Sequence, residues 1–220
     1  MNLRSGYDAF RSTPFSTAAF TFALIGCVSL IVALSSPEWL ESKPESNSNF
    51  VRLGLWKVCF RQYQHPSLKF DGVFNGCYSL HGHKSESIRN WLQPGWFVFV
   101  QCLTTCSTLL SALCVCILIF MHFQSEVEIR IFVSAFVFVF EAISALLAFL
   151  GVCIFGAMCF ERSWIQYPKS NTLSLGYAFA AVGALTLACG ASLILAQTFR
   201  MRRLLYRNNT IMYHVPLSNK

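Results

Sequence analysis

Four long apolar segments constrain this chain more than any other feature of its sequence. Each is at least as long as the run of about 20 residues that a helix needs to cross a bilayer. The chain is 55% apolar and only 12% charged, which leaves too little polar surface for a soluble globule of this size. We therefore predict one membrane domain over residues 1–220, an all-α bundle of four transmembrane helices at about residues 15–35, 96–123, 131–160 and 173–199.

The first segment has an alternative interpretation as a cleaved signal peptide, because Arg4 and Arg11 precede it and residues 33–35 resemble a cleavage site. Its apolar run exceeds the usual ~7–15 residues, which favours a retained span. Residues 200–220 follow the last segment and contain four arginines, one lysine and no acid. Basic residues beside membrane helices mark the cytosolic side. We therefore expect both termini in the cytosol, and the net charge of +7 indicates contact with membrane lipids, not with nucleic acid.

This topology places a long loop (about 36–95) and a short loop (about 161–172) outside the cell. In the long loop, residues 50–60 and 72–80 have the composition of strands. Cys59 and Cys77 are the two cysteines that lie clearly outside the membrane segments. An oxidising compartment favours their pairing, and closing a loop of this length contributes about 3 kcal/mol. We predict a Cys59–Cys77 disulfide that joins two strands of a small antiparallel sheet.

Two patterns within the apolar segments predict helix packing. Gly176, Gly183 and Gly190 recur every seven residues, so they share a helix face that allows close approach of a neighbouring helix. Glu141 lies eleven residues after Arg130, about 16 Å into the membrane. We interpret it as a structural residue that hydrogen-bonds to Ser, Thr or Gln on another helix. The alternative is a transport or proton pathway, because ionisable residues at this depth are often functional.

The sequence offers little chemistry. Cys102 and Cys106 lie one helical turn apart, but no histidine or carboxylate near them completes a metal site, and no nucleophile–base motif is present. Cys114 and Cys116 lie near the inner end of the second segment, where palmitoylation is an alternative to a purely apolar role. We expect no enzymatic activity, no cofactor and no metal.

One spaced set of residues in the long loop points to a family. The chain resembles the claudin superfamily, which includes claudins, peripheral myelin proteins, epithelial membrane proteins and calcium-channel gamma subunits. This resemblance implies a left-handed four-helix bundle that carries an extracellular sheet, with four strands from the first loop and one from the second. Its signature is a tryptophan, a Gly-Leu-Trp tripeptide, two cysteines and a basic residue before the second span, here Trp39, Gly54, Leu55, Trp56, Cys59, Cys77 and Arg89.

By that resemblance, the chain contacts itself or related claudin-like proteins within one membrane and between cells. It is then a structural protein of lateral cell–cell junctions in the plasma membrane, where it forms or regulates a paracellular barrier. The alternative is an auxiliary subunit of an ion channel or receptor, in which the glycine face of the fourth span packs on the partner. We expect exposed contact residues in the second loop at Trp164, Ile165 and Tyr167, with a position at the lipid boundary as the alternative for all three.

The chain departs from vertebrate claudins at two places. Seventeen residues separate Cys59 from Cys77, more than claudins usually have. The last residue is Lys220, which does not fit the apolar pocket that PDZ scaffolds offer to a terminal valine, so we do not expect anchoring to such scaffolds. Both departures resemble divergent invertebrate claudin-like proteins of septate junctions.

Overall fold

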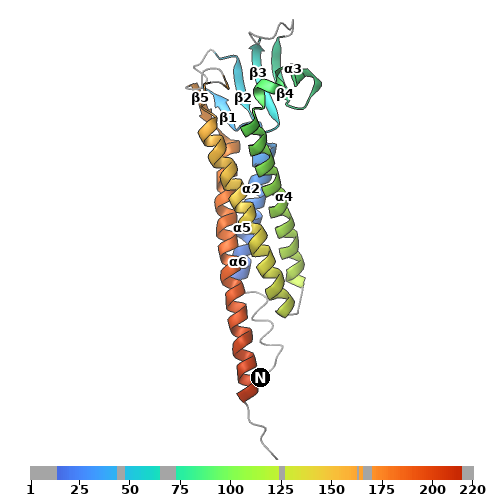
Figure 1. The fold of residues 1–220 in the computed structure, drawn as a ribbon, viewed down its shortest axis with the longest axis vertical. Coiled ribbons are helices and arrows are strands. Elements are labelled where there is room, and N and C mark those ends of the chain that lie inside the picture. The colour runs from blue at the N-terminus through green and yellow to red at the C-terminus, as the bar shows by residue number, and fades with distance from the viewer. Residues whose placement is uncertain are drawn as a thin grey trace, which may run out of the picture.

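A bundle of long helices carries a sheet at one end (Figure 1). The computed structural model describes residues 14–43, 48–64, 73–123, 127–162, 164–165 and 170–214. Among these residues, four helices are long and apolar enough to cross a membrane. They confirm the predicted membrane bundle, and their bounds are α2 (Pro14–Ser35), α4 (Gly95–Phe123), α5 (Val127–Met158) and α6 (Leu175–His214).

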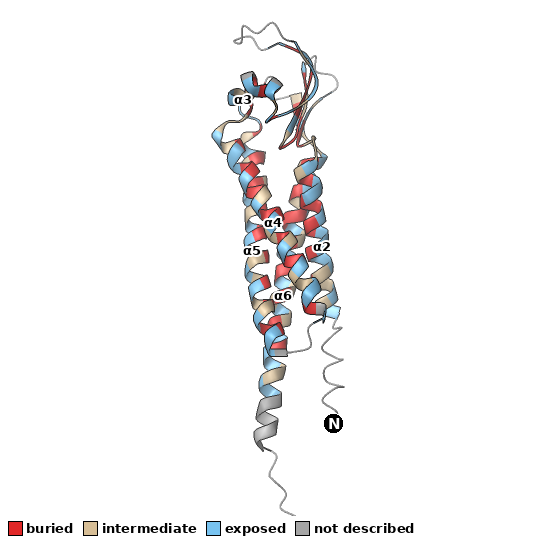
Figure 2. Cartoon of the chain, turned by 90° about the vertical axis from the view of Figure 1, so that its right-hand side faces the viewer, coloured by how far each residue is buried: buried red, intermediate tan, exposed pale blue. Residues whose placement is uncertain are grey.

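The four helices form a closed ring in which α2 and α5 each pack against both α4 and α6. Large apolar side chains cover the outside of the ring, and Leu109, Phe132 and Leu185 are each about two-thirds exposed. Figure 2 shows this exposed outer surface around a buried interior. Such a surface suits lipid and not water. The last helix, α6, has 40 residues, about 60 Å of helix, and it extends past its neighbours at the end opposite the sheet (Figure 1).

The glycine face of α6 packs inside the bundle against α2. A Cβ atom added to Gly183 would lie 2.9 Å from Cδ2 of Leu30, and one added to Gly190 would lie 3.3 Å from the backbone nitrogen of Ala23. Gly26 of α2 faces α6 in turn, since its added Cβ would lie 2.6 Å from Cδ2 of Leu187. These glycines allow the two helix backbones to approach closely.

Both loops contribute to one five-stranded antiparallel sheet in the described part of the chain, in the order β4-β3-β2-β1-β5. Four strands come from the first loop and one from the second, as the resemblance implied. The predicted strand at 72–80 is β4. The predicted strand at 50–60 was wrong in its extent, because the chain reverses there and forms two strands. The bounds are β1 (Leu40–Ser42), β2 (Phe50–Leu53), β3 (Lys57–Tyr63), β4 (Phe74–Ser79) and β5 (Asn171–Leu173).

A short segment joins the sheet to the bundle. It contains the 3-10 turn η1 (His83–Ser85) and the helix α3 (Glu86–Leu92), of which Ile88 and Leu92 are fully buried. Both belong to a hydrophobic core that runs without interruption from the sheet into the upper ends of the helices. The sheet is therefore fixed to the bundle by a shared core.

Candidate functional site

The two faces of the sheet differ in burial, and the strand register shows which residues belong to each. Leu40 pairs with Leu53, and Leu53 pairs with Val58. All three side chains are fully buried. Because side chains alternate across a strand, the neighbouring residues point to the opposite face. The inner face is thus the one that packs on the bundle, whereas the outer face carries exposed residues such as Glu41, Lys57 and Arg61.

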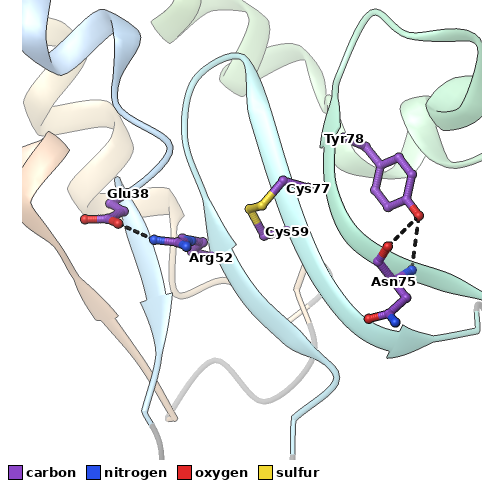
Figure 3. The surroundings of a disulfide bond; sticks show 6 residues. All are labelled: Glu38, Arg52, Cys59, Asn75, Cys77 and Tyr78. Atoms are coloured by element: carbon purple, nitrogen blue, oxygen red, sulfur yellow. Dashed lines mark hydrogen bonds and ion pairs between the residues drawn. A yellow bond between two sulfur atoms is a disulfide. The ribbon is translucent and has the colours of Figure 1, made fainter.

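The disulfide lies in a row of paired residues that crosses the outer face. Glu41 pairs with Arg52, Arg52 with Cys59, and Cys59 with Cys77. The predicted bond between Cys59 and Cys77 is present, and it joins β3 to its neighbour, the edge strand β4 (Figure 3). Cys77 is exposed whereas Cys59 is buried. The disulfide therefore holds the exposed edge strand β4 to the adjacent strand β3.

Charges on this outer face are partly compensated. Arg52 forms an ion pair and a hydrogen bond with Glu38 through its Nη1 atom, as Figure 3 shows. Lys57 and Arg61 of β3 are exposed, and among the described residues neither has an ion pair with an acid. The part of the outer face that β3 forms is therefore basic, whereas acidic Glu38 and Glu41 accompany Arg52 towards β1.

Gly54 allows the chain reversal between β2 and β3. An added Cβ would lie 2.2 Å from the backbone oxygen of Ser36 and 2.6 Å from Cα of Pro37. The amide of Gly54 donates a hydrogen bond of 2.8 Å to the carbonyl of Lys57, which closes the turn. Glycine is required here because the turn lies directly on the backbone that leaves α2.

Trp39 anchors the first loop in an aromatic cluster at the upper end of the bundle. It is fully buried, and its Nε1 donates a 2.7 Å hydrogen bond to the carbonyl of Ala33. Its ring centroid lies 5.0 Å from that of Phe155 of α5 and 6.1 Å from that of Tyr177 of α6. Gly176 makes room for it, since a Cβ there would lie 2.7 Å from Cδ1 of Trp39. The signature tryptophan thus connects three helices.

The second loop contributes to the same cluster, and this corrects one expectation. Trp164 and Ile165 are 4% and 1% exposed, so they are not the exposed contact residues that we predicted. The Trp164 ring centroid lies 4.5 Å from that of Trp96, and its Nε1 donates a 3.2 Å hydrogen bond to the carbonyl of Leu92. Both residues close the core where the second loop crosses the bundle. Tyr167 lies outside the described residues.

The remaining signature residues, Leu55, Trp56 and Arg89, connect the Gly54 turn to α3 and α4 through hydrogen bonds. Leu55 is fully buried, and its carbonyl accepts a hydrogen bond from Nε2 of Gln101 in α4. Arg89 donates a 3.2 Å hydrogen bond from Nε to the carbonyl of Leu80. The amide of Leu80 in turn donates to the carbonyl of Trp56 at 3.0 Å. Sequence analysis missed Gln101, a polar residue just inside an apolar segment.

Tyr63 closes the inner face near α3. Its ring stacks on Phe60 at 4.7 Å and on Trp91 at 5.9 Å between centroids. Burial raises the pKa of the Tyr63 hydroxyl to about 12, because the charged form is poorly solvated there. Tyr63 is therefore neutral at physiological pH and serves the core. Within the described ranges, no three His, Cys, Asp or Glu side chains come close enough together to hold a metal ion.

Glu141 of α5 is fully buried in the bundle. Hydroxyl contacts join α5 to its neighbours nearby: Ser144 and Ser107 donate to each other's carbonyls at 2.8 and 2.7 Å, and the hydroxyls of Ser134 and Thr198 lie 2.7 Å apart. None of these groups bonds to the carboxyl, and no N–H or O–H of the described residues donates to either of its oxygens; the side chain beside it is the thiol of Cys114 in α4, a weak donor. The predicted hydrogen bond to a Ser, Thr or Gln is not formed.

Replacement of Glu141 by leucine should leave the bundle as stable as before, or stabilise it by about 1–3 kcal/mol. A buried polar group without a partner costs free energy, whereas leucine fills similar space with apolar atoms. The unfolding temperature of the purified chain in detergent measures this. Ser144→Ala is the control and should lower that temperature. A lower temperature for Glu141→Leu would show instead that the carboxyl has a stabilising partner.

The described residues define the class of the protein: a membrane protein with four spanning helices, whose two loops on one side fold into a single disulfide-linked sheet. Residues 24–196 match the family model of PMP-22/EMP/MP20/Claudin tight junction proteins. This match covers more than half of the chain, which therefore belongs to that family. A search of curated proteins found no match. The family is one of structural membrane proteins and not of enzymes.

Proposed function

We propose that this protein forms or regulates a paracellular barrier at lateral cell–cell junctions, with the outer face of its sheet as the contact surface. The proposal rests on the firm attachment of the sheet to the bundle. Its inner face shares one core with the bundle, its edge strand is held by the Cys59–Cys77 bond, and Lys57 and Arg61 stay exposed on the outer face. A preorganised surface of this kind loses little conformational entropy when it binds a partner.

The proposed orientation follows from the same residues. A disulfide persists in an oxidising compartment, so the sheet faces the outside of the cell. The described part of the basic segment after the fourth span, which contains Arg200 and Arg203, then lies on the cytosolic side, where arginines near membrane helices accumulate. Its partners would be further copies or related proteins, beside it in the membrane or on the opposite cell, as in septate or tight junctions.

The position of the glycine face favours the barrier role over an auxiliary channel subunit. In an auxiliary subunit, the glycine face of the fourth span, which includes Gly183 and Gly190, would pack on the partner. Both residues pack on α2 of the same chain instead, so they leave no such surface free. The outer face of the sheet is then the better candidate for contact with another protein.

The test compares the tagged protein with a Cys59→Ser, Cys77→Ser double variant in a polarised epithelium. We expect the intact protein in the lateral junctional belt, and we expect loss of that position and of electrical resistance across the monolayer in the variant. A Cys102→Ser, Cys106→Ser variant is the matched control, because these exposed cysteines of α4 are free thiols. Diffuse membrane staining of the intact protein, away from cell contacts, would contradict the proposal.

A second pair of variants tests the surface itself without disturbing the fold. Lys57→Glu and Arg61→Glu change exposed side chains of β3 and should leave junctional localisation intact. If the outer face lines the paracellular path, reversal of its charge should raise the permeability to small cations relative to anions. An unchanged permeability ratio in correctly localised protein would show that the outer face lies away from the ion path.

A further inference from the structure

A cavity of about 310 Å³ lies between the helices at the end of the bundle opposite the sheet. All four long helices contribute to its lining, and apolar side chains dominate it: Phe20 of α2, Leu118 and Met121 of α4, and Ile194 of α6. Its volume is in the lower range of small-molecule sites. The cavity therefore has room for part of a lipid molecule, a head group with the first carbons of its chain.

One charged side chain projects into this apolar space. Arg130 of α5 lines the cavity and is only 7% exposed. Ser134 and Gln197 add a hydroxyl and an amide to the same wall. A guanidinium has five N–H donors in a planar fork that matches phosphate oxygens. Arg130 can therefore hold a phosphate in addition to any partner within the chain.

The cavity opens towards lipid. Ile119 and Phe123 of α4 line it, and they are also 48% and 75% exposed on the outer surface of the bundle. The guanidinium of Arg200 lies 5.7 Å from the ring centroid of Phe15, which precedes the lining residue Ser16 in the sequence. The cavity thus combines apolar walls that reach the outer surface of the bundle with positive charge near the ends of the helices.

We propose that this cavity binds the head-group end of one anionic phospholipid, with the first carbons of one acyl chain between Phe20, Leu118 and Ile194 and its phosphate at Arg130. Basic pockets between membrane helices on the cytosolic side suit anionic head groups, and the proposed orientation places this end of the bundle there. The site is independent of the sheet, so its failure would leave the barrier proposal standing.

The experiment uses the full-length chain in detergent micelles that contain phosphatidylserine or phosphatidylcholine with identical chains. Native mass spectrometry counts the lipid molecules that remain bound. We expect one retained phosphatidylserine, preferred over phosphatidylcholine by about tenfold, because the choline ammonium offsets the phosphate charge that Arg130 pairs with, whereas phosphatidylserine keeps a net negative charge. Arg130→Gln should reduce this preference to near parity.

Two further variants keep the test decisive. Arg202→Gln removes an exposed charge of α6 and should retain the preference. Leu118→Trp fills the cavity and should expel the lipid while every arginine remains. This variant tests the site even if Arg130→Gln does not fold. The proposal would be overturned if the unmodified chain retained both lipids equally, or if Arg202→Gln lost the preference for phosphatidylserine as fully as Arg130→Gln. It would also be overturned if Leu118→Trp still retained the lipid, or if inorganic phosphate displaced it.

Discussion

Replacement of Gly54 by alanine should detach the sheet from the bundle, because the new methyl group has no space. It would lie 2.2 Å from the Ser36 oxygen and 2.6 Å from the Pro37 Cα, and both are backbone atoms at the end of α2 that cannot rotate away as a side chain would. The turn would have to move, which would also break the hydrogen bond from Gln101 to the Leu55 carbonyl. We expect a loss of about 4 kcal/mol or more in stability, the range of severe core disruptions.

Surface biotinylation and the unfolding temperature in detergent measure this loss, and we expect the alanine variant to be retained inside the cell. Gly95→Ala is the matched control. It is the same substitution at the first residue of α4, and its added Cβ has no atom within 4 Å. Normal surface levels of Gly54→Ala, with an unchanged unfolding temperature, would contradict the argument and show that the turn can shift at little cost.

The features that could be predicted from the sequence depend on short-range patterns. Helix length and apolar composition are local properties, so the predicted segments agree with α2, α4, α5 and α6 apart from their ends. The largest difference is in α6, which continues to His214. Its last turns are polar and basic, and a search for apolar residues therefore ends the helix too early. The Cys59–Cys77 bond was predictable because few cysteines lie outside the membrane segments.

The features that sequence analysis missed depend on contacts between distant parts of the chain. The reversal at Gly54 is one, because it requires the end of α2 to lie against the turn. The burial of Trp164 is another, since its partners Trp96 and Leu92 are about seventy residues away in sequence. An aromatic residue in a short loop is as compatible with an interface as with a core. The two roles, interface residue and core residue, are distinguished only by how the ends of the helices pack around the loop.

Replacement of Trp39 by alanine should cost about 3–5 kcal/mol, the usual range for loss of a fully buried tryptophan. The indole contacts Phe155 and Tyr177, and it fills the space above Gly176. The surrounding helices cannot collapse into the gap because Gly176 has no side chain to extend and Phe155 is already packed against Phe97 and Trp164. We expect a lower unfolding temperature and loss of the protein from the cell surface.

Two substitutions separate the contributions of Trp39. Trp39→Phe keeps most of the apolar volume but removes the hydrogen bond from Nε1 to the Ala33 carbonyl, so it should cost less than the alanine variant by about 2 kcal/mol or more. Trp56→Ala is the control within the same signature. Its ring is only half-buried, with its centroid 5.7 Å from that of His81, so its loss should be tolerated better. If Trp56→Ala destabilised the chain as much as Trp39→Ala, the anchor of the loop would be the turn and not the aromatic cluster.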